Sequence, residues 1–404
     1  MSALPAVRAS LVEPAFTGIV LLFAALYGAY GTESPFFPAF LSERNVSAEQ
    51  IGLVLGAGTA IKLLAAPVAG RLADRLGAGQ WVLAGFAAST GLLGLLLLAT
   101  SGFWAVLAGV LAWSVAIAPL APLADALALQ ASDGGRRFPY GWVRGVGSAA
   151  FVGGTFLSGP LVDRLGLPTI LWLSGALFGM TALLASRVGS GARPVAPSQT
   201  GGFAGVSVLL RDPVYRTILI VAGLIMGSHA MSDVFAVIRW RETGIGGWLV
   251  SLLWSDAVLA EVVVFFVLGP WLLGRLGPAA GAAIAAAAGI VRWSVMGLTA
   301  SLPAMVVVQS LHGLTFALLH LSAMQVIGRV VPPGLAATAQ TLYGAVAVGV
   351  ANVAFTLASG PLYAHFGASG FFVMAVLCAL ALPFTPGLRG SDDAAARVPA
   401  ESTS

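Results

Sequence analysis

Several ionisable side chains of this 404-residue chain fall inside long apolar stretches, where a charge is costly and is retained mainly for function. The charged members are Glu33, Lys62, Asp125, Arg144, Asp233, Asp256, Glu261 and Arg292, and the titratable histidines are His229, His312 and His320. Such groups can carry a proton or hold a charged ligand, so we take them as the candidate functional residues.

Three of these residues, Glu261, Arg292 and His312, form a combination suited to proton transfer. A carboxylate near an arginine ionises easily and loses that preference when the arginine moves away. A histidine titrates close to neutral pH and can relay a proton. We predict a proton-coupling group from these three side chains, and the alternative is a static buried salt bridge between helices.

A second group is suited to binding a substrate. Asp125 and Arg144 flank a short turn and lie about two helical turns deep, so they can face each other. Lys62, the only lysine, lies too deep in its apolar stretch for its stem to reach the headgroups easily. We predict that it faces a cavity, opposite Asp125 or an incoming carboxylate. The alternatives are an ion pair at the cytoplasmic mouth for Asp125 and Arg144, and a snorkelling ammonium for Lys62.

Arg292, which also belongs to the proton-coupling group, and two histidines complete the predicted substrate-binding set. Gln309, His312, Phe316 and His320 form one stripe at helical spacing, which should face a cavity because lipid offers no polar partner. His229 has small neighbours and is the second candidate. For both His229 and His320 the alternative is a packing histidine with a satisfied hydrogen bond.

The composition places these residues in a membrane. The chain is 58% hydrophobic and 9% charged with a mean hydropathy of +0.94, whereas soluble domains carry about 25% charged residues. The apolar runs are about the length of a spanning helix and lack strand-like alternation. We predict an all-α polytopic membrane protein of twelve spans. They are 15–41, 49–70, 80–100, 103–130, 139–162, 168–187, 214–238, 247–272, 279–300, 302–330, 336–361 and 367–386.

The spans divide into two halves of six. We predict an N-terminal half at 1–187, a cytoplasmic linker rich in Gly, Pro and Ser at 188–213, a C-terminal half at 214–386 and a disordered cytoplasmic tail at 387–404. Arginines are concentrated in the loops on the side of both termini, which by the positive-inside rule is cytoplasmic. We expect the bacterial inner membrane as the location.

A short phrase recurs four times at matched intervals. It reads GRLADRLG at 70–77, GPLVDRLG at 159–166, GPWLLGRLG at 269–277 and GPLYAHFG at 360–367. Each copy follows the second helix of a triplet, and consecutive triplets must run in opposite directions. This is the pattern of 3+3 inverted repeats nested within two parallel halves.

The first copy of this phrase resembles the loop 2–3 gating motif of the major facilitator superfamily, with Gly70, Asp74, Arg75 and Gly77 matching. A closer resemblance, to phenylpropionate permeases and the lactose-permease-like proton symporters, runs from about residue 16 to 380. It is carried by YGTESPFFPAFL, RRFPYGWVRGVGSAAF, GIVRWSVMG and QSLHGLTFALLHLSAM. It implies two six-helix halves and alternating access to a substrate cavity between them.

The resemblance also implies roles for individual residues. Glu261, Arg292 and His312 match the glutamate, arginine and histidine that serve proton coupling in lactose permease. Asp125 and Arg144 stand where that permease has a carboxylate and an arginine for its substrate. One departure is Thr315, which occupies the place of a second proton-carrying glutamate, so the proton must reside elsewhere or coupling is lost.

We expect a proton-coupled importer of a small organic acid, with an aromatic carboxylate such as a phenylpropionate-like compound as the leading class. The alternatives are a sugar or nucleoside proton symporter, a drug or metabolite efflux transporter, and a receptor or scaffold without transport. The sequence contains no phosphate-binding loop, HExxH motif or nucleophile elbow. We therefore expect no enzyme activity, no cofactor or metal and no nucleic-acid partner, and a functional monomer that binds substrate, proton and lipid.

Overall fold

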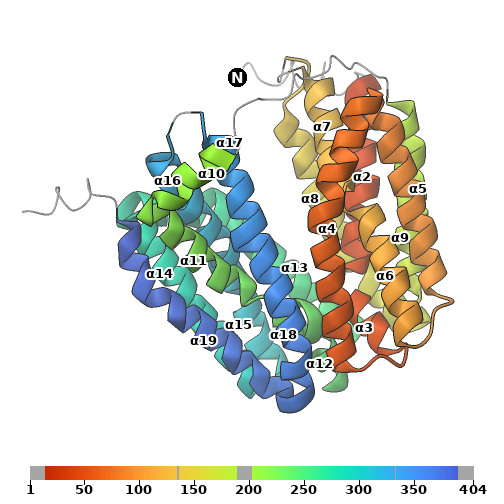
Figure 1. The fold of residues 1–404 in the computed structure, drawn as a ribbon. Helices are drawn as coiled ribbons and strands as arrows, with labels where there is room; N and C mark the ends of the chain where they lie inside the picture. Colours follow the sequence, from red (N-terminus) through yellow and green to blue (C-terminus); the bar gives the residue numbers. More distant parts are fainter. Residues whose placement is uncertain (1–13, 134–135, 189–202, 333, 390–404) are drawn as a thin grey trace, which may run out of the picture. The chain divides into compact units, whose positions relative to one another are not determined.

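The structure, a computed structural model, describes residues 14–133, 136–188, 203–332 and 334–389. All regular secondary structure in these ranges is helical (Figure 1). The helices group into two compact units. Among the described residues, unit 1 contains those before 189 together with 240–255, and unit 2 contains the remainder.

Unit 1 is built around a central helix that packs against two later ones. Its helices are α2 (Pro14–Glu33), α3 (Phe37–Ser42), α4 (Ala48–Leu76), α5 (Gly79–Leu97), α6 (Phe103–Ile117), α7 (Leu120–Ser132), α8 (Tyr140–Leu165) and α9 (Thr169–Arg187). Helix α2 packs against α8 and α9, and α5 packs against α9 and α6. The first predicted span is thus divided between α2 and α3, because Pro35 and Pro38 interrupt the helix as expected.

Unit 2 contains more interruptions than unit 1. Its elements are α10 (Phe203–Arg211), α11 (Pro213–Gly227), α12 (Ala230–Glu242), α13 (Gly247–Val263), η1 (Val264–Leu268), α14 (Gly269–Leu298), α15 (Leu302–Ser310), η2 (Leu314–Leu318), α16 (Leu319–Val330), α17 (Ala336–Leu342), η3 (Tyr343–Val350), α18 (Ala351–Phe366), η4 (Gly367–Gly370), α19 (Phe371–Ala381) and η5 (Leu382–Leu388). Helix α12 ends and α13 begins in unit 1. Helix α14 packs against α19 and α16, whereas α11 packs against α18 and η3. Three elements, η1, η2 and η3, are π-helical turns.

The described helices account for the twelve predicted spans. Ten continuous helical stretches are long and apolar enough to cross a membrane, and two of them, 247–298 and 336–388, are of double length at 52 and 53 residues. Each double stretch bends at a glycine with positive φ, Gly277 at 75° and Gly367 at 52°. Each double stretch is therefore long enough for two crossings, which gives room for twelve crossings among the described residues.

Glycines with positive φ also explain why the short phrase recurs. All four copies end on such a glycine, namely Gly77, Gly166, Gly277 and Gly367. A residue with positive φ cannot continue a right-handed helix, and glycine adopts positive φ without steric cost. The repeat therefore marks the end of the second helix in every triplet.

Close helix contacts through small residues hold α2 against α8. A Cβ on Gly154 would collide with the carbonyl of Gly28, and one on Gly31 would collide with Phe151. The Thr155 hydroxyl donates to the Gly31 carbonyl at 3.0 Å. The small-residue run in this part of the sequence thus serves backbone packing, and it sets the neighbouring turns of α2 and α8 side by side.

The start of α13 is held by α8 within unit 1. The Asp163 carboxylate, in the second copy of the phrase, accepts hydrogen bonds from the backbone N–H groups of Gly247 at 2.6 Å and Trp248 at 2.9 Å. These are first-turn N–H groups, which have no partner inside their own helix and favour a negative charge. The contact explains why residues 240–255 group with unit 1.

Two predicted segments fall partly outside the described residues. Within the predicted linker 188–213, residues 189–202 are not described and α10 occupies 203–211. Within the predicted tail 387–404, η5 continues to Leu388, and 390–404 lie outside the described residues. The division into halves at 187 and 214 stays a prediction.

The role of the terminal glycine can be tested in the third copy of the phrase. At Gly277 φ is 75° and ψ is 170°, a region that is essentially restricted to glycine. We expect Gly277→Ala to destabilise the purified protein by about 1–3 kcal/mol, seen as a lower apparent melting temperature in detergent. Gly274→Ala is the matched control, because Gly274 is helical and nothing lies within 4 Å of its added Cβ. Equal shifts for both variants would contradict the assignment.

Candidate functional site

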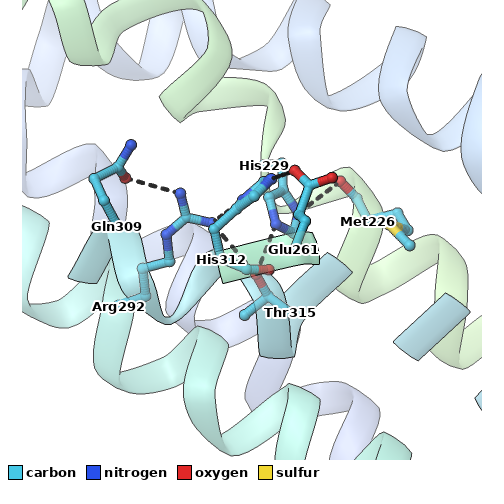
Figure 2. Close-up of polar contacts among 7 residues, drawn as sticks. All are labelled: Met226, His229, Glu261, Arg292, Gln309, His312 and Thr315. Carbon is cyan, nitrogen blue, oxygen red and sulfur yellow. Dashed lines mark hydrogen bonds and ion pairs between the residues drawn. The ribbon is translucent and has the colours of Figure 1, made fainter. Parts of the chain in front are cut away.

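A buried arginine in unit 2 lies among several polar side chains (Figure 2). The Arg292 side chain projects from α14, and the residue is only 2% exposed. Its Nη2 donates to Gln309 Oε1 at 2.9 Å, and its Nη1 contacts His312 Nδ1 at 2.7 Å and Thr315 Oγ1 at 3.3 Å. The guanidinium also stacks over the Trp293 ring at 4.5 Å. A buried guanidinium needs such partners, because an unpaired one would be strongly destabilising.

The histidine beside this arginine has a defined tautomer. A guanidinium has only donors, so His312 Nδ1 must accept from Arg292 and cannot carry a proton. The proton of the neutral ring therefore lies on Nε2, which contacts Glu261 Oε1 at 2.7 Å. His312 thus connects the buried Arg292 to the carboxylate, and the His312 and Glu261 side chains keep 17% and 23% exposure.

A second histidine reaches the same cluster through a threonine. His229 lies between α11 and α12, is 5% exposed, and places Nε2 at 2.9 Å from Thr315 Oγ1. Its ring also stands edge-on to those of His312 and Trp293, with centroids 5.2 Å away in each case. Thr315 was singled out in the sequence only as a missing carboxylate, whereas the structure makes it the contact between His229 and Arg292.

The helix crossing that brings Glu261 to His312 depends on a glycine. A Cβ on Gly313, next to His312, would collide with the Ala260 carbonyl on α13. The π-helical turn η2 begins one residue later and contacts η1, which follows α13 directly. Such turns are frequent at functional sites.

The same π-helical turn separates His320 from the residues around Arg292. Gln309 and His312 both reach Arg292, but an extra residue in the turn rotates the helix beyond it by about 100° relative to a continuous α-helix. The His320 ring lies 6.0 Å from the rings of Phe265 and Tyr343, away from the cluster. His320 therefore does not join the contacts around Arg292, and its place in a cavity-facing stripe and a substrate contact there stay predictions.

Unit 1 contains a more accessible cation, at the facing pair predicted between α7 and α8. Arg144 Nη1 lies 3.4 Å from Asp125 Oδ1, which also accepts from the Tyr140 hydroxyl at 2.8 Å. Nη1 also donates to the Tyr27 hydroxyl, and the guanidinium carbon lies 5.0 Å from the centroid of that ring. Gly147 leaves room for the Tyr27 ring, because a Cβ there would lie 3.0 Å from it.

The Arg144 guanidinium has two nitrogens, Nε and Nη2, without a hydrogen-bond partner among the described residues. Within the described part of the chain, all its hydrogen bonds leave from Nη1, and its side chain is 43% exposed. Nε and Nη2 are the pair that a carboxylate can accept from side by side. The arrangement can bind a carboxylate next to the Tyr27 ring.

Lys62 has different neighbours from those predicted. Its ammonium lies 5.3 Å from the centroid of the Trp113 ring on α6, within electrostatic range of the Glu33 carboxylate. Glu33 is 5% exposed, and the Ser174 hydroxyl of α9 lies beside it. Asp125 instead contacts Arg144, so the pairing of Lys62 with Asp125 was wrong. A role of Lys62 toward an incoming carboxylate stays a prediction.

The predicted gating residues lie at the end of α4. Gly77 donates its N–H to the Asp74 carbonyl at 3.3 Å and ends the helix, whereas Asp74 and Arg75 are exposed. Gly70 lies within the helix with open space beside it. The described residues show a helix end here, and gating by these residues stays a prediction.

The fold and these buried charged groups define a membrane transporter of the major facilitator superfamily. The chain belongs to the MFS_1 like family, which it matches over residues 18–374. It is 33% identical, over 387 residues, to the “Probable 3-phenylpropionic acid transporter” of Escherichia coli (strain K12), covering 91% of this chain and 96% of that protein. It is 23% identical to the “Uncharacterized transporter YwbF” of Bacillus subtilis (strain 168), covering 84% and 86%.

Solved structures agree on the fold. The nucleoside transporter NupG superposes with a TM-score of 0.79 at 15% identity, covering 93% of this chain and 98% of that chain. A bacterial homolog of the human lysosomal transporter Spinster superposes with a TM-score of 0.73 at 13% identity, covering 92% and 96%. The predicted fold of twelve helices with nested inverted repeats is therefore confirmed.

The glycine that allows Glu261 to reach His312 offers a test of the site. We expect Gly313→Ala to push α13 away from His312 and to destabilise the protein by about 1–3 kcal/mol, as overpacking does. Gly328→Ala on α16 is the matched control, because nothing lies within 4 Å of its added Cβ. The stability of both variants is measured as the apparent melting temperature in detergent. An unchanged melting temperature for Gly313→Ala would show that the crossing tolerates a side chain.

Proposed function

We propose that this transporter takes up a small aromatic carboxylate together with a proton, by alternating access. The observation that carries the proposal is the contact between Glu261 and His312 beside the buried Arg292. In an apolar helix bundle a carboxylate is stable when ionised only near a cation, or when it is protonated. Movement of Arg292 or binding of a substrate can therefore decide whether Glu261 holds a proton.

The substrate class is supported by the accessible cation in unit 1. Arg144 combines donors that have no partner in the described part of the chain with an adjacent tyrosine ring, which suits a ligand that has a carboxylate and an aromatic group. Lys62, with the Trp113 ring beside it, offers a second cation of the same kind. The name of the Escherichia coli relative, which refers to 3-phenylpropionic acid, points to the same chemical class.

Location and assembly follow from the same proposal. The arginine-rich loops on the side of both termini support a cytoplasmic location for them. Uptake driven by protons fits the inner membrane of a bacterium, where protons are pumped outward. Each chain holds its own coupling cluster in unit 2 and its own cation in unit 1. A monomer is thus sufficient for transport.

The proposal predicts a separation of accumulation from exchange. In proteoliposomes with an imposed pH gradient, we expect 3-phenylpropionate to accumulate in preference to sugars and nucleosides. Glu261→Gln should abolish accumulation but leave exchange of internal for external substrate, because exchange requires no net release of the proton. Glu49→Gln, at the exposed start of α4, is the control and should keep both activities. Gradient-driven uptake of a sugar or nucleoside alone would replace the proposed substrate, and equal loss of both activities would point to a structural role for Glu261.

The binding of the carboxylate can be tested on the two cations. Arg144→Lys keeps the charge but removes the paired donors, so we expect KM for an aromatic carboxylate to rise about tenfold. Lys62→Ala should weaken binding of a carboxylate far more than binding of its neutral amide. Arg275→Lys is the matched control, since Arg275 also stacks on a tryptophan ring but lies exposed after α14 begins. An unchanged KM in Arg144→Lys would remove Arg144 from the substrate site.

A further inference from the structure

The protonation chemistry of His229 is restricted by its backbone neighbours. Its Nδ1 lies 3.0 Å from the Ile225 carbonyl oxygen and 3.3 Å from that of Met226. A carbonyl oxygen only accepts, so Nδ1 must carry a hydrogen in both the neutral and the charged ring. A proton that binds to His229 therefore binds at Nε2, the atom that faces Thr315.

The Thr315 hydroxyl can satisfy either state of this ring. Its oxygen lies 2.9 Å from His229 Nε2, 3.1 Å from the carbonyl oxygen of His312 and 3.3 Å from Arg292 Nη1. When His229 is neutral, the hydroxyl donates to Nε2 and accepts from Arg292. When Nε2 is protonated, it donates to the hydroxyl, which turns to donate to the His312 carbonyl. In both states His229 Nε2, the Thr315 hydroxyl and Arg292 Nη1 have a partner, and losing one in a buried site would be costly.

We propose that His229 is a second proton-accepting group of the coupling cluster and that the Thr315 hydroxyl links its protonation to Arg292. This inference rests on the proposed proton coupling and adds to it. The sequence assigned His229 to substrate contact, whereas its Nε2 is directed at Thr315 (Figure 2). A histidine reached through Thr315 supplies a titratable group beside the very position where the sequence lacks a carboxylate.

The charges around His229 determine when a proton is accepted. The groups that face it or its immediate neighbours are Arg292 on α14, His312 and Thr315 at η2, Asp233 one turn further on α12, Glu261 on α13 behind His312, and Cys378 on α19 beside Ser228. A positive charge on His229 repels Arg292, and ionised Glu261 and Asp233 oppose that repulsion. Protonation of His229 is therefore favoured while Glu261 is ionised, and protonation of either group makes protonation of the other less favourable.

A direct test is to observe the ring nitrogens. The chain has four histidines, so ¹⁵N-histidine NMR of the full-length protein in lipid can be assigned with single His→Gln variants. We expect neutral His229 with hydrogen on Nδ1, neutral His312 with hydrogen on Nε2, and protonation of His229 at Nε2 as the pH is lowered. Thr315→Val should shift that titration, whereas Thr315→Ser, which keeps the hydroxyl, should not. A His229 Nε2 that stays unprotonated throughout would overturn the proposal.

Transport supplies the second readout. In the same proteoliposomes we expect His229→Gln to reduce gradient-driven accumulation about tenfold or more, with fewer protons taken up per substrate, while exchange stays within about twofold. His365→Gln, an exposed histidine at the end of α18, is the matched control. If His229→Gln also loses exchange, the comparison of Thr315→Val with Thr315→Ser tests the proposal instead. A link through the hydroxyl predicts that accumulation is reduced in the valine variant and kept in the serine variant. An unchanged proton count in these variants, with the wild type still coupled, overturns the role of His229 but not the proposed function.

Discussion

The burial of Arg292 is the constraint around which unit 2 is arranged. A guanidinium cannot lose its charge under physiological conditions, so an apolar helix bundle must surround it with acceptors. Gln309 and Thr315 supply oxygen atoms, and His312 supplies a bare ring nitrogen. That last contact forces the proton of His312 to the opposite nitrogen and so directs it at Glu261. The tautomer of His312 and its contact with Glu261 therefore both follow from the buried charge of Arg292.

Arg292 in unit 2 and Arg144 in unit 1 differ in burial and in hydrogen bonding, and the difference matches the roles proposed for them. The Arg292 residue is 2% exposed with its terminal nitrogens engaged. The Arg144 side chain is 43% exposed, and among the described residues it is hydrogen-bonded through Nη1 alone. A buried cation whose two terminal nitrogens are engaged can influence neighbouring protons but has little capacity for a ligand. A cation with unpartnered donors beside an aromatic ring can receive a carboxylate.

Irregular helical segments lie where the polar groups meet. His229 occupies the break between α11 and α12, Thr315 lies in the π-helical turn η2, and Glu261 lies just before η1. In lipid, a helix can be interrupted only where other protein groups take over its backbone partners. The Nδ1 of His229 does this for the Ile225 and Met226 carbonyls. The interruptions and the polar cluster therefore support each other energetically.

The sequence alone determined the membrane class, the spans and the nested repeat, because composition, apolar length and helix-ending glycines are local properties. It also identified the charged residues, since any charge in such an environment stands out. It could not assign their partners. Lys62 faces Trp113 and Glu33 instead of Asp125, and His320 does not join Gln309 at Arg292. The partners of a side chain depend on how its helix is rotated about its axis. The π-helical turn at 314–318 changes that rotation, and rules that assume 3.6 residues per turn do not account for it. Only the tertiary structure placed Thr315 between His229 and Arg292, because that contact joins three separate helical segments.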